Sequence, residues 1–285
     1  MPSLQLRANR MSYVNSRVGQ WPSVFAYLQE VVRYRHLLWN LVGSDLRSRF
    51  RRSRVGIFWA MIQPLAFALM LSTVWGSILK DSDHVTFTIY VLSGITIWEY
   101  YTTAIMGGLD ALINAGGYMK QSRIPFLIFQ ARLPLSSTVI FFFGVISLLL
   151  VLGVTEKFPP LGLHYLLVPV FFVMMVLLCI PLTIVFSVLG TQYRDTKHIV
   201  GIVIQGMFFI TPVMLPREIL ESPHLHWLVY ANPAVSVLSL FRDPLVYGRF
   251  WDPIMVATFV CWTIAFWVIA IILSARFGRR LVFAI

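Results

Sequence analysis

Six long apolar stretches occupy most of this chain, and they limit its fold more than any other feature. A helix that crosses a bilayer needs about 20 mostly apolar residues. Hydrophobic residues make up 58% of the chain and charged residues 12%, whereas soluble domains contain about 25% charged residues. The excess apolar surface must therefore face lipid, and we predict an all-α, polytopic membrane protein with six transmembrane helices. The stretches are Val55–Leu79, Phe87–Leu109, Leu133–Val154, Leu163–Gly190, Ile199–Leu215 and Ile254–Ala275.

The Lys and Arg residues predict how these helices are oriented. Eighteen of the 23 basic residues lie on the side of the two termini, and five lie on the opposite side. Cytoplasmic loops of membrane proteins carry such an excess. We therefore expect a multi-pass protein of the cell inner (plasma) membrane with both termini in the cytoplasm. The net charge of +11 is then explained by topology, and no nucleic-acid partner is expected.

Residues Val24 to Val42 have the spacing of an amphipathic helix. At about 100° per residue, their apolar side chains share one face and most polar side chains lie opposite. Ser23 is placed to cap the start of this helix and Gly43 to end it. The segment is too polar to span a bilayer, so we expect a helix that lies in the cytoplasmic interface of the membrane. The alternative is a soluble helix packed on a partner.

The connection between the fifth and sixth stretches is on the outer side but is strongly apolar. Short apolar pieces suggest re-entrant or interfacial helices, whose backbone must be satisfied by protein or by a water-filled cavity. We therefore expect re-entrant outer helices here, with an ordinary loop as the alternative. The prolines that divide the connection are Pro216, Pro223, Pro233, Pro244 and Pro253.

The sequence lacks the common motifs of catalysis and cofactor binding. A phosphate-binding loop of the Walker A type needs Gly-Lys, and this dipeptide does not occur in the chain. We therefore expect no ATP site, no cofactor and no enzymatic activity in this chain. His224 and His226 form a lone His-x-His without a third ligand, so we interpret them as surface residues rather than a metal site. Cys179 and Cys261 lie in apolar stretches and are interpreted as packing residues.

The second stretch carries an aromatic stripe and one acidic residue. Phe87, Tyr90, Trp98 and Tyr101 fall within an arc of about 80° on a helix and are candidate lining residues of a substrate channel. Helix packing or an aromatic belt at the membrane surface is the alternative. Glu99 lies near the middle of the stretch, where a carboxylate suggests a function. We favour a structural hydrogen bond or a position in the wall of a wet channel over a proton relay.

Several short motifs resemble, in order and spacing, those of type-2 ABC exporter permeases, the membrane subunits of polysaccharide, O-antigen, capsule and teichoic-acid exporters. The resemblance runs from about Phe25 to the C-terminus. The motifs are Arg49–Trp59 with Gln63-Pro64, Gly94 and Trp98, Asn114, Lys120, Arg123-Ile124-Pro125, Tyr193-Arg194-Asp195, Thr211-Pro212-Val213, Asn232-Pro233 and Leu240-Phe241-Arg242.

This resemblance implies a homodimer that associates with two copies of a separate ABC ATPase, which would bind ATP and Mg. It implies a polysaccharide or glycolipid substrate, contact with membrane lipid, and periplasmic export partners as a further expectation. In this family the connection after the second span carries a cytoplasmic coupling helix. Here that helix would cover Asn114 to Pro125, with Lys120 and Arg123 at the ATPase.

We accordingly divide the chain into four parts: a cytoplasmic tail (1–22), an interface helix with a basic linker (23–54), a permease domain (55–275) and a second cytoplasmic tail (276–285). The first residues are polar and lack the apolar core of a signal peptide. Three other functions remain alternatives: a proton-coupled secondary transporter using Glu99, a related permease for lipids or drugs, and a membrane transferase. The last lacks paired carboxylates, and the first lacks an inverted repeat.

Overall fold

The computed structural model describes residues 32–79, 83–121, 124–214 and 226–284, and within them all regular secondary structure is helical. The predicted all-α fold is thereby confirmed for the described residues. The elements are α3 (Arg35–Arg49), η1 (Gly56–Phe58), α4 (Trp59–Leu79), α5 (His84–Gln121), α6 (Phe126–Val154), η2 (Leu163–Leu166), α7 (Leu167–Gln192), α8 (Thr196–Ile210), α9 (His226–Ala231), α10 (Pro233–Leu245) and α11 (Pro253–Ala284).

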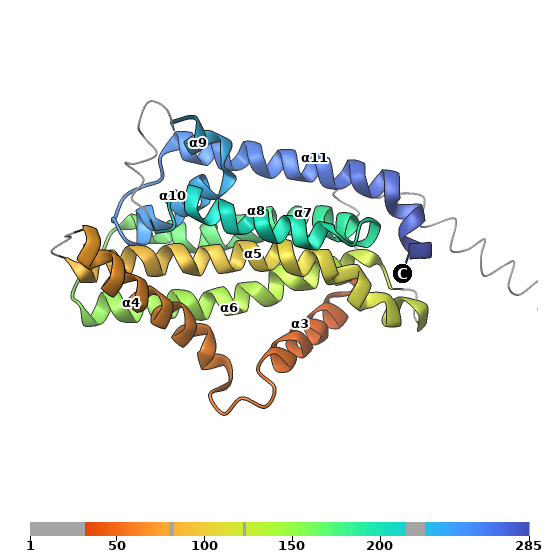
Figure 1. Ribbon diagram of the computed structural model, residues 1–285, viewed down its shortest axis with the longest axis horizontal. Helices are drawn as coiled ribbons and strands as arrows, with labels where there is room; N and C mark the ends of the chain where they lie inside the picture. Colours follow the sequence, from red (N-terminus) through yellow and green to blue (C-terminus); the bar gives the residue numbers. More distant parts are fainter. Residues whose placement is uncertain (1–31, 80–82, 122–123, 215–225, 285) are drawn as a thin grey trace, which may run out of the picture.

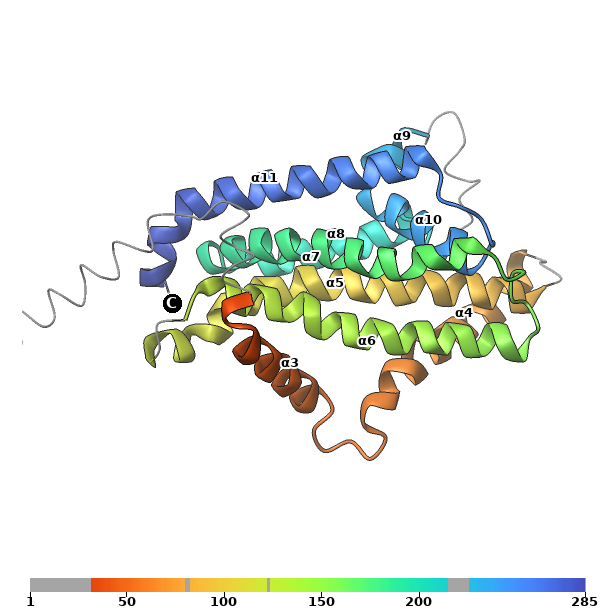
Figure 2. The same cartoon turned by 180° about the vertical axis from the view of Figure 1, so that it is seen from behind.

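The long helices form a bundle with α5 at its centre. Helices α5, α6, α7, α8 and α11 run along the long axis of the molecule, while α4 crosses it at an angle (Figure 1). Helix α5 contacts α4, α6, α7, α8 and α10. The short helices α9 and α10 lie at one end of the bundle, and the C-terminal parts of α5 and α11 lie at the other (Figure 2).

Glycines let the central helices approach closely. A Cβ atom added to Gly190 of α7 would lie 2.8 Å from the Cα of Leu109 on α5, and one added to Gly108 would lie 3.2 Å from the Cα of Thr183. Small residues have this role where helices pack in membranes, because lipid gives no hydrophobic drive for association and close contact supplies the attraction. These two glycines therefore fix α5 against the C-terminal half of α7.

Aromatic rings fill the space between α6, α7 and α10. Phe141 lies 5.0 Å from Phe172, 5.6 Å from Phe241 and 5.3 Å from Tyr100, measured between ring centroids. Phe171 lies 5.3 Å from Phe241. Because α10 contributes Phe241 to this cluster, this part of the connection between the fifth and sixth stretches belongs to the core.

Among the residues that the structure describes, four helical segments are both long and apolar enough to cross a membrane: Gly56–Trp75, Phe126–Val154, Leu163–Gln192 and Pro253–Phe277. Helix α5 has 38 residues and is long enough, but Glu99 and Asp110 lower its apolar character. Helix α8 has 15 residues and extends only about 22 Å at 1.5 Å per residue. The count of six spans therefore stays a prediction.

The expected end of the interface helix at Gly43 is wrong. Helix α3 continues through Gly43 to Arg49, and the expected start at Ser23 lies outside the described residues. A terminating glycine adopts positive φ, but in this region the positive φ angles belong to Arg52 (72°) and Gly56 (62°). The helix continues because Asp45, one half-turn beyond Gly43, pairs with Arg132 of α6 at 3.4 Å.

The connection after α5 also differs from expectation. Asn114 is followed by two more turns of the same helix, which ends only at Gln121. The expected coupling segment therefore begins as a continuation of α5 rather than as a separate helix. Pro125 is the N-cap residue of α6.

Candidate functional site

Helix α10 is inserted into the end of the bundle that the sequence predicts to face outward, which we call the outer end. Twelve of its 13 residues are buried, from Pro233 to Leu245 with only Asp243 partly open. Asn232 caps the helix, since its side-chain oxygen accepts from the N–H of Ala234 at 3.0 Å, and its amide donates to Thr211 Oγ1 at 2.7 Å. The start of α10 is thus attached to the segment that follows α8.

Arg242 holds the other end of α10 against α5 and the same segment. Its guanidinium donates to Ser93 Oγ (3.0 Å), to the Tyr90 carbonyl (2.9 Å) and to two further carbonyls. These are the carbonyls of Pro212 at 2.6 Å and Val213 at 3.0 Å. Arg242 is 4% exposed. Charge-assisted hydrogen bonds of this kind are stronger than neutral ones, so one side chain joins three parts of the fold.

Tyr90 and Gly94 complete the surroundings of this guanidinium. The Arg242 guanidinium carbon lies 3.6 Å from the Tyr90 ring centroid, a cation–π contact, and the Tyr90 hydroxyl donates to the Pro212 carbonyl at 3.0 Å. A Cβ atom on Gly94 would lie 2.6 Å from Arg242 Nη2. Only glycine therefore leaves room for the guanidinium at this turn of α5.

These contacts bring together motifs that are far apart in the sequence. Gly94, Thr211-Pro212-Val213, Asn232-Pro233 and Arg242 meet in one cluster, which we call the outer clamp. The sequence predicted each of these as a separate motif, Leu240-Phe241-Arg242 included, but it predicted no partners for Arg242. The available signal was a single arginine within the apolar run Val235–Val246, because a charge in such a run needs partners.

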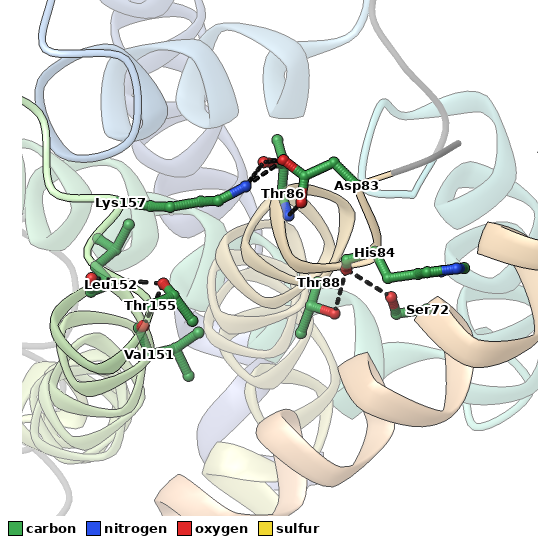
Figure 3. A network of polar contacts seen from close by, with 9 residues as sticks. All are labelled: Ser72, Asp83, His84, Thr86, Thr88, Val151, Leu152, Thr155 and Lys157. Atoms are coloured by element: carbon green, nitrogen blue, oxygen red, sulfur yellow. Dashed lines mark hydrogen bonds and ion pairs between the residues drawn. The ribbon is translucent and has the colours of Figure 1, made fainter. Parts of the chain in front are cut away.

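A second polar network ties the outer ends of α4, α5 and α6 (Figure 3). Lys157 Nζ donates to the Asp83 carboxylate and, at 2.6 Å, to Thr86 Oγ1. The hydroxyl of Ser72 donates to the His84 carbonyl at 2.9 Å. The hydrogen bond from Lys157, followed by those from Thr86, lowers the pKa of Asp83. Lys157 therefore stabilises the charged carboxylate at the start of α5.

The aromatic stripe of the second stretch is divided in the fold. Phe87 is buried at 5% exposure, and Tyr90 lies beneath Arg242. Trp98 and Tyr101 are partly buried, with ring centroids 6.2 Å apart. Trp98 also makes an edge contact at 5.6 Å with Phe208 of α8. Trp98 and Tyr101 thus form an inner aromatic pair at the contact between α5 and α8, and the role of this pair in a channel stays a prediction.

Glu99 faces a crevice between the first turns of α4 and the middle of α5 and α6. The crevice is lined by Arg49 from α3, by Ala60 and Pro64 from α4, and by residues of α5 and α6. The positive charge of Arg49 acts on the half-buried carboxylate. The basic residue that lines this crevice together with Glu99 comes from the end of α3 and not from another span.

The expected coupling residues lie at the opposite end from the outer clamp. Asn114 and Tyr118 are exposed on the last turns of α5, and Pro125 is partly open. The side chain of Lys120 and the whole of Arg123 lie outside the described residues.

Nearby contacts at this end join helices that lie far apart in the sequence. Lys197 of α8 pairs with Asp110 of α5 at 2.6 Å. Burial raises the pKa of Asp45, and the charge of Arg132 opposes this shift. The first pair joins α8 to α5, and the Asp45–Arg132 pair joins α3 to α6, at the end where an ATPase is expected to bind.

Among the residues that the structure describes, no three His, Cys, Asp or Glu side chains gather into a metal site. His224 and the side chain of His226 lie outside those residues. Cys179 is buried and Cys261 exposed, and both are free thiols.

Comparison with known proteins gives a family match over most of the chain. Residues 36–246 match the family model described as ABC-2 type transporter. The O-antigen export system permease protein RfbA of Myxococcus xanthus is 25% identical over 216 residues, which cover 75% of this chain and 82% of the relative. The Klebsiella pneumoniae protein of the same name is 22% identical over 215 residues, covering 74% and 81%.

A third relative has a different exported polymer in its name. The polysialic acid transport protein KpsM of Escherichia coli is 24% identical over 208 residues, which cover 72% of this chain and 79% of the relative. All three alignments span most of both chains, and the family match includes α3, the bundle as far as α8, and the outer clamp. The chain therefore belongs to the ABC-2 type transporter family.

Proposed function

We propose that this chain is the membrane permease of an ATP-driven exporter that moves a polysaccharide or lipid-linked glycan, of the O-antigen or capsule type, across the inner membrane. The single observation that carries the proposal is the family match, together with relatives named for O-antigen export and polysialic acid transport. The motor would be a separate ABC ATPase that binds ATP and Mg, because Gly-Lys does not occur in this chain.

Within this proposal the permease has six spans, with α5 and α8 as the second and fifth. Helix α8 falls short of the bilayer thickness of about 30 Å, but Thr211 to Met214 follow it directly and are buried. Helix α10 would be the re-entrant outer helix, since protein surrounds it and satisfies its polar groups. Helix α3 would lie in the cytoplasmic interface, with exposed Arg33 and Trp39 at the headgroups.

A homodimer is supported by the surface of α8. None of its 15 residues is buried, although the helix is apolar, and Ile199, Ile202 and Phe209 are each more than 60% exposed. A second copy that packs against this face would place the Trp98–Tyr101 pair next to the dimer axis. The two copies would then enclose the channel that these rings are proposed to line.

The test is a deletion of the permease in the producing cell. Surface polysaccharide should disappear and return with the wild-type chain, but not when the partner ATPase carries an inactive Walker A lysine. The purified permease should bring down that ATPase. Export that continues without ATP hydrolysis and follows the proton gradient would refute the proposal and favour a secondary transporter.

A companion test addresses orientation. An impermeant thiol reagent in intact cells should label a His224→Cys permease and leave a Ser53→Cys permease unlabelled, with Cys261 replaced by Ser in both. Labelling at position 53 would contradict cytoplasmic termini.

A further inference from the structure

Helix α8 runs along the bundle (Figure 1) and is held firmly at its outer end. The Thr211 hydroxyl accepts from the Asn232 amide at 2.7 Å. The carbonyls of Pro212 and Val213 accept from the Arg242 guanidinium, and Thr211 and Val213 are buried. Breaking these contacts would leave buried polar groups without partners, which is costly. The outer end of α8 therefore stays with α10 and the outer half of α5.

The inner end of α8 is held much more weakly. Lys197 Nζ donates to the Asp110 carboxylate of α5 at 2.6 Å, but the two side chains are 51% and 34% exposed. An exposed ion pair contributes little to stability. None of the 15 residues of α8 is buried, whereas 12 of the 26 residues of α7 are. The inner end is therefore able to separate from α5 at small cost.

The backbone at both ends of α8 allows the helix to change its tilt. Thr211 (φ −85°, ψ 140°) and Tyr193 (φ −133°, ψ 107°) are extended and interrupt the helical path. Hinges are often residues at the ends of elements. Lys197 precedes Thr211 by about four helical turns, which is about 21 Å along the axis at 1.5 Å per residue. A change in tilt of about 10° at Thr211 therefore moves the inner end by about 4 Å.

We infer that α8 turns about its clamped outer end during the transport cycle, with the Asp110–Lys197 pair as the latch that holds its inner end in the resting position. Asp110 and Asn114 are one turn apart on the same face of α5, and Asn114 begins the segment expected to contact the ATPase. Because α5 is one continuous helix as far as Gln121, a push on its end is transmitted directly to Asp110. The latch thereby links the ATPase to α8.

The inference rests on the proposed function, and it adds the moving part and the residues that hold it. In the proposed dimer the exposed face of α8 lies beside the channel between the two copies. Release of the inner end widens the cytoplasmic entrance of that channel. Phe208 is close to the hinge and keeps its contact with Trp98, so the aromatic pair stays in place while the entrance opens.

The test uses the complete exporter with its ATPase and two cysteine reporters, with Cys261 replaced by Ser. The inner reporter is Met106→Cys with Gly201→Cys, because a Cβ atom on Gly201 would lie 3.9 Å from Met106 Cε. The outer reporter is Trp98→Cys with Phe208→Cys, whose ring centroids are 5.6 Å apart. A short, reducible bifunctional thiol reagent joins each pair, and mass spectrometry of the joined peptides measures the cross-link. A non-hydrolysable ATP analogue should lower the inner cross-link severalfold and leave the outer one unchanged.

The latch is then varied in the inner-reporter protein without nucleotide. Asp110→Asn and Lys197→Gln should each lower the cross-link per folded, ATPase-bound permease by about two- to fivefold, the range that an exposed ion pair gives. The charge swap, Asp110→Lys with Lys197→Asp, should restore it. Arg194→Gln is the matched control, because it removes an exposed positive charge just before α8, and its cross-link should be unchanged.

Export by cells that make their own polymer supplies an independent readout. Joining the inner reporter should stop export, because the latched helix no longer turns, and reduction of the cross-link should restore it. Gly201→Cys alone is the control. It should export normally after the same treatment, and it gives the background of cross-links between copies.

Several results would overturn the inference. An inner cross-link indifferent to the nucleotide or to both charge replacements would exclude the latch, and so would export that continues while the inner reporter is joined. An equal fall at both reporters would show that α8 moves as a whole and not about its outer end. If the single replacements reduce the amount of folded complex, a charge swap that leaves the cross-link low would show that the two residues do not act as a pair. These outcomes leave the proposed function intact, whereas surface polymer that persists after permease deletion overturns both.

Discussion

The Arg242 guanidinium carbon lies 3.6 Å from the centre of the Tyr90 ring, although the two residues are 152 positions apart in the sequence. Tyr90 begins the turn of α5 that also contains Ser93 and Gly94. The contact joins α10 to the central helix, and the backbone of Pro212 supplies an acceptor to both side chains. Movement of α8 and movement of α10 are therefore coupled through one guanidinium.

Replacing Arg242 should weaken this coupling strongly. Arg242→Met leaves the carbonyls of Tyr90, Pro212 and Val213 without this donor, and each buried polar group that loses its partner costs about 1–3 kcal/mol. Arg242→Lys should recover only part of the loss, because an ammonium lacks the planar fork that reaches several acceptors. Thermal unfolding of the purified exporter complex measures the effect. Arg249→Met, at an exposed arginine, is the control and should change little.

Gly94→Ala should disturb the same clamp by steric conflict. The added methyl group meets the Val213 carbonyl and Arg242 Nη2, so either the guanidinium or the backbone after α8 has to shift. Overpacking of this kind typically costs about 1–3 kcal/mol. Gly206→Ala is the matched control, since a Cβ there meets nothing within 4 Å. Equal unfolding temperatures for the two variants would contradict the packing described for Gly94.

The Asp83–Lys157 pair should make stability depend on acidity. Lys157 lowers the pKa of Asp83 below the ordinary value of 3.8. The stabilisation is therefore complete above about pH 4 and is lost as the pH falls from there through the lowered pKa. The unfolding temperature of Asp83→Asn should approach that of the wild type in this acidic range. The effect should be small, because solvent reaches both side chains of the pair and screens their charges. A constant difference across the whole range would show that this carboxylate does not titrate with folding.

The inner aromatic pair should matter for transport more than either ring alone. If Trp98 and Tyr101 line the channel, their contacts with a sliding polymer are individually weak. Trp98→Ala should then slow export only partly, and Trp98→Ala with Tyr101→Ala should slow it much more per folded molecule. If the rings only pack against Phe208, the loss should appear as unfolding, by about 3–5 kcal/mol per buried ring. Export normalised to folded, membrane-inserted permease separates the two cases.

Charge reversal at the end of α5 should uncouple the permease from its ATPase. Lys120→Glu with Arg123→Glu should reduce both co-purification of the ATPase and export, while membrane insertion stays normal. Arg276→Glu, on the C-terminal part of α11, is a control of the same charge change. Unchanged export in the double variant would count against Asn114–Pro125 as the coupling segment.

Much of the architecture follows from local composition. Insertion into a bilayer depends on the apolar content of each segment, so stretches such as Leu133–Val154 predict helices without knowledge of their neighbours. The basic residues predict orientation for the same reason. The short motifs were sufficient to indicate the family, which the match over residues 36–246 then showed.

The ends of elements were less predictable. Gly43 has the residue type that ends helices, yet the packing of α3 on α6 keeps it helical. The sequence predicts that Asn114 to Gln121 belong to the connection after the second span, but these residues continue α5. At both places packing between helices keeps the chain helical, although the residue types favour the end of a helix there. Neither place has a residue with positive φ.

The meeting of distant residues was decided by the tertiary structure alone. The sequence contained Gly94, Pro212 and Arg242 as separate motifs, and it contained Glu99 without a visible partner. Whether such residues meet depends on how far each helix is rotated and how deep it sits, and packing between helices sets both quantities. Composition specifies that α5, α8 and α10 are apolar, but only their packing places Arg242 on Tyr90 and brings Arg49 to the crevice of Glu99.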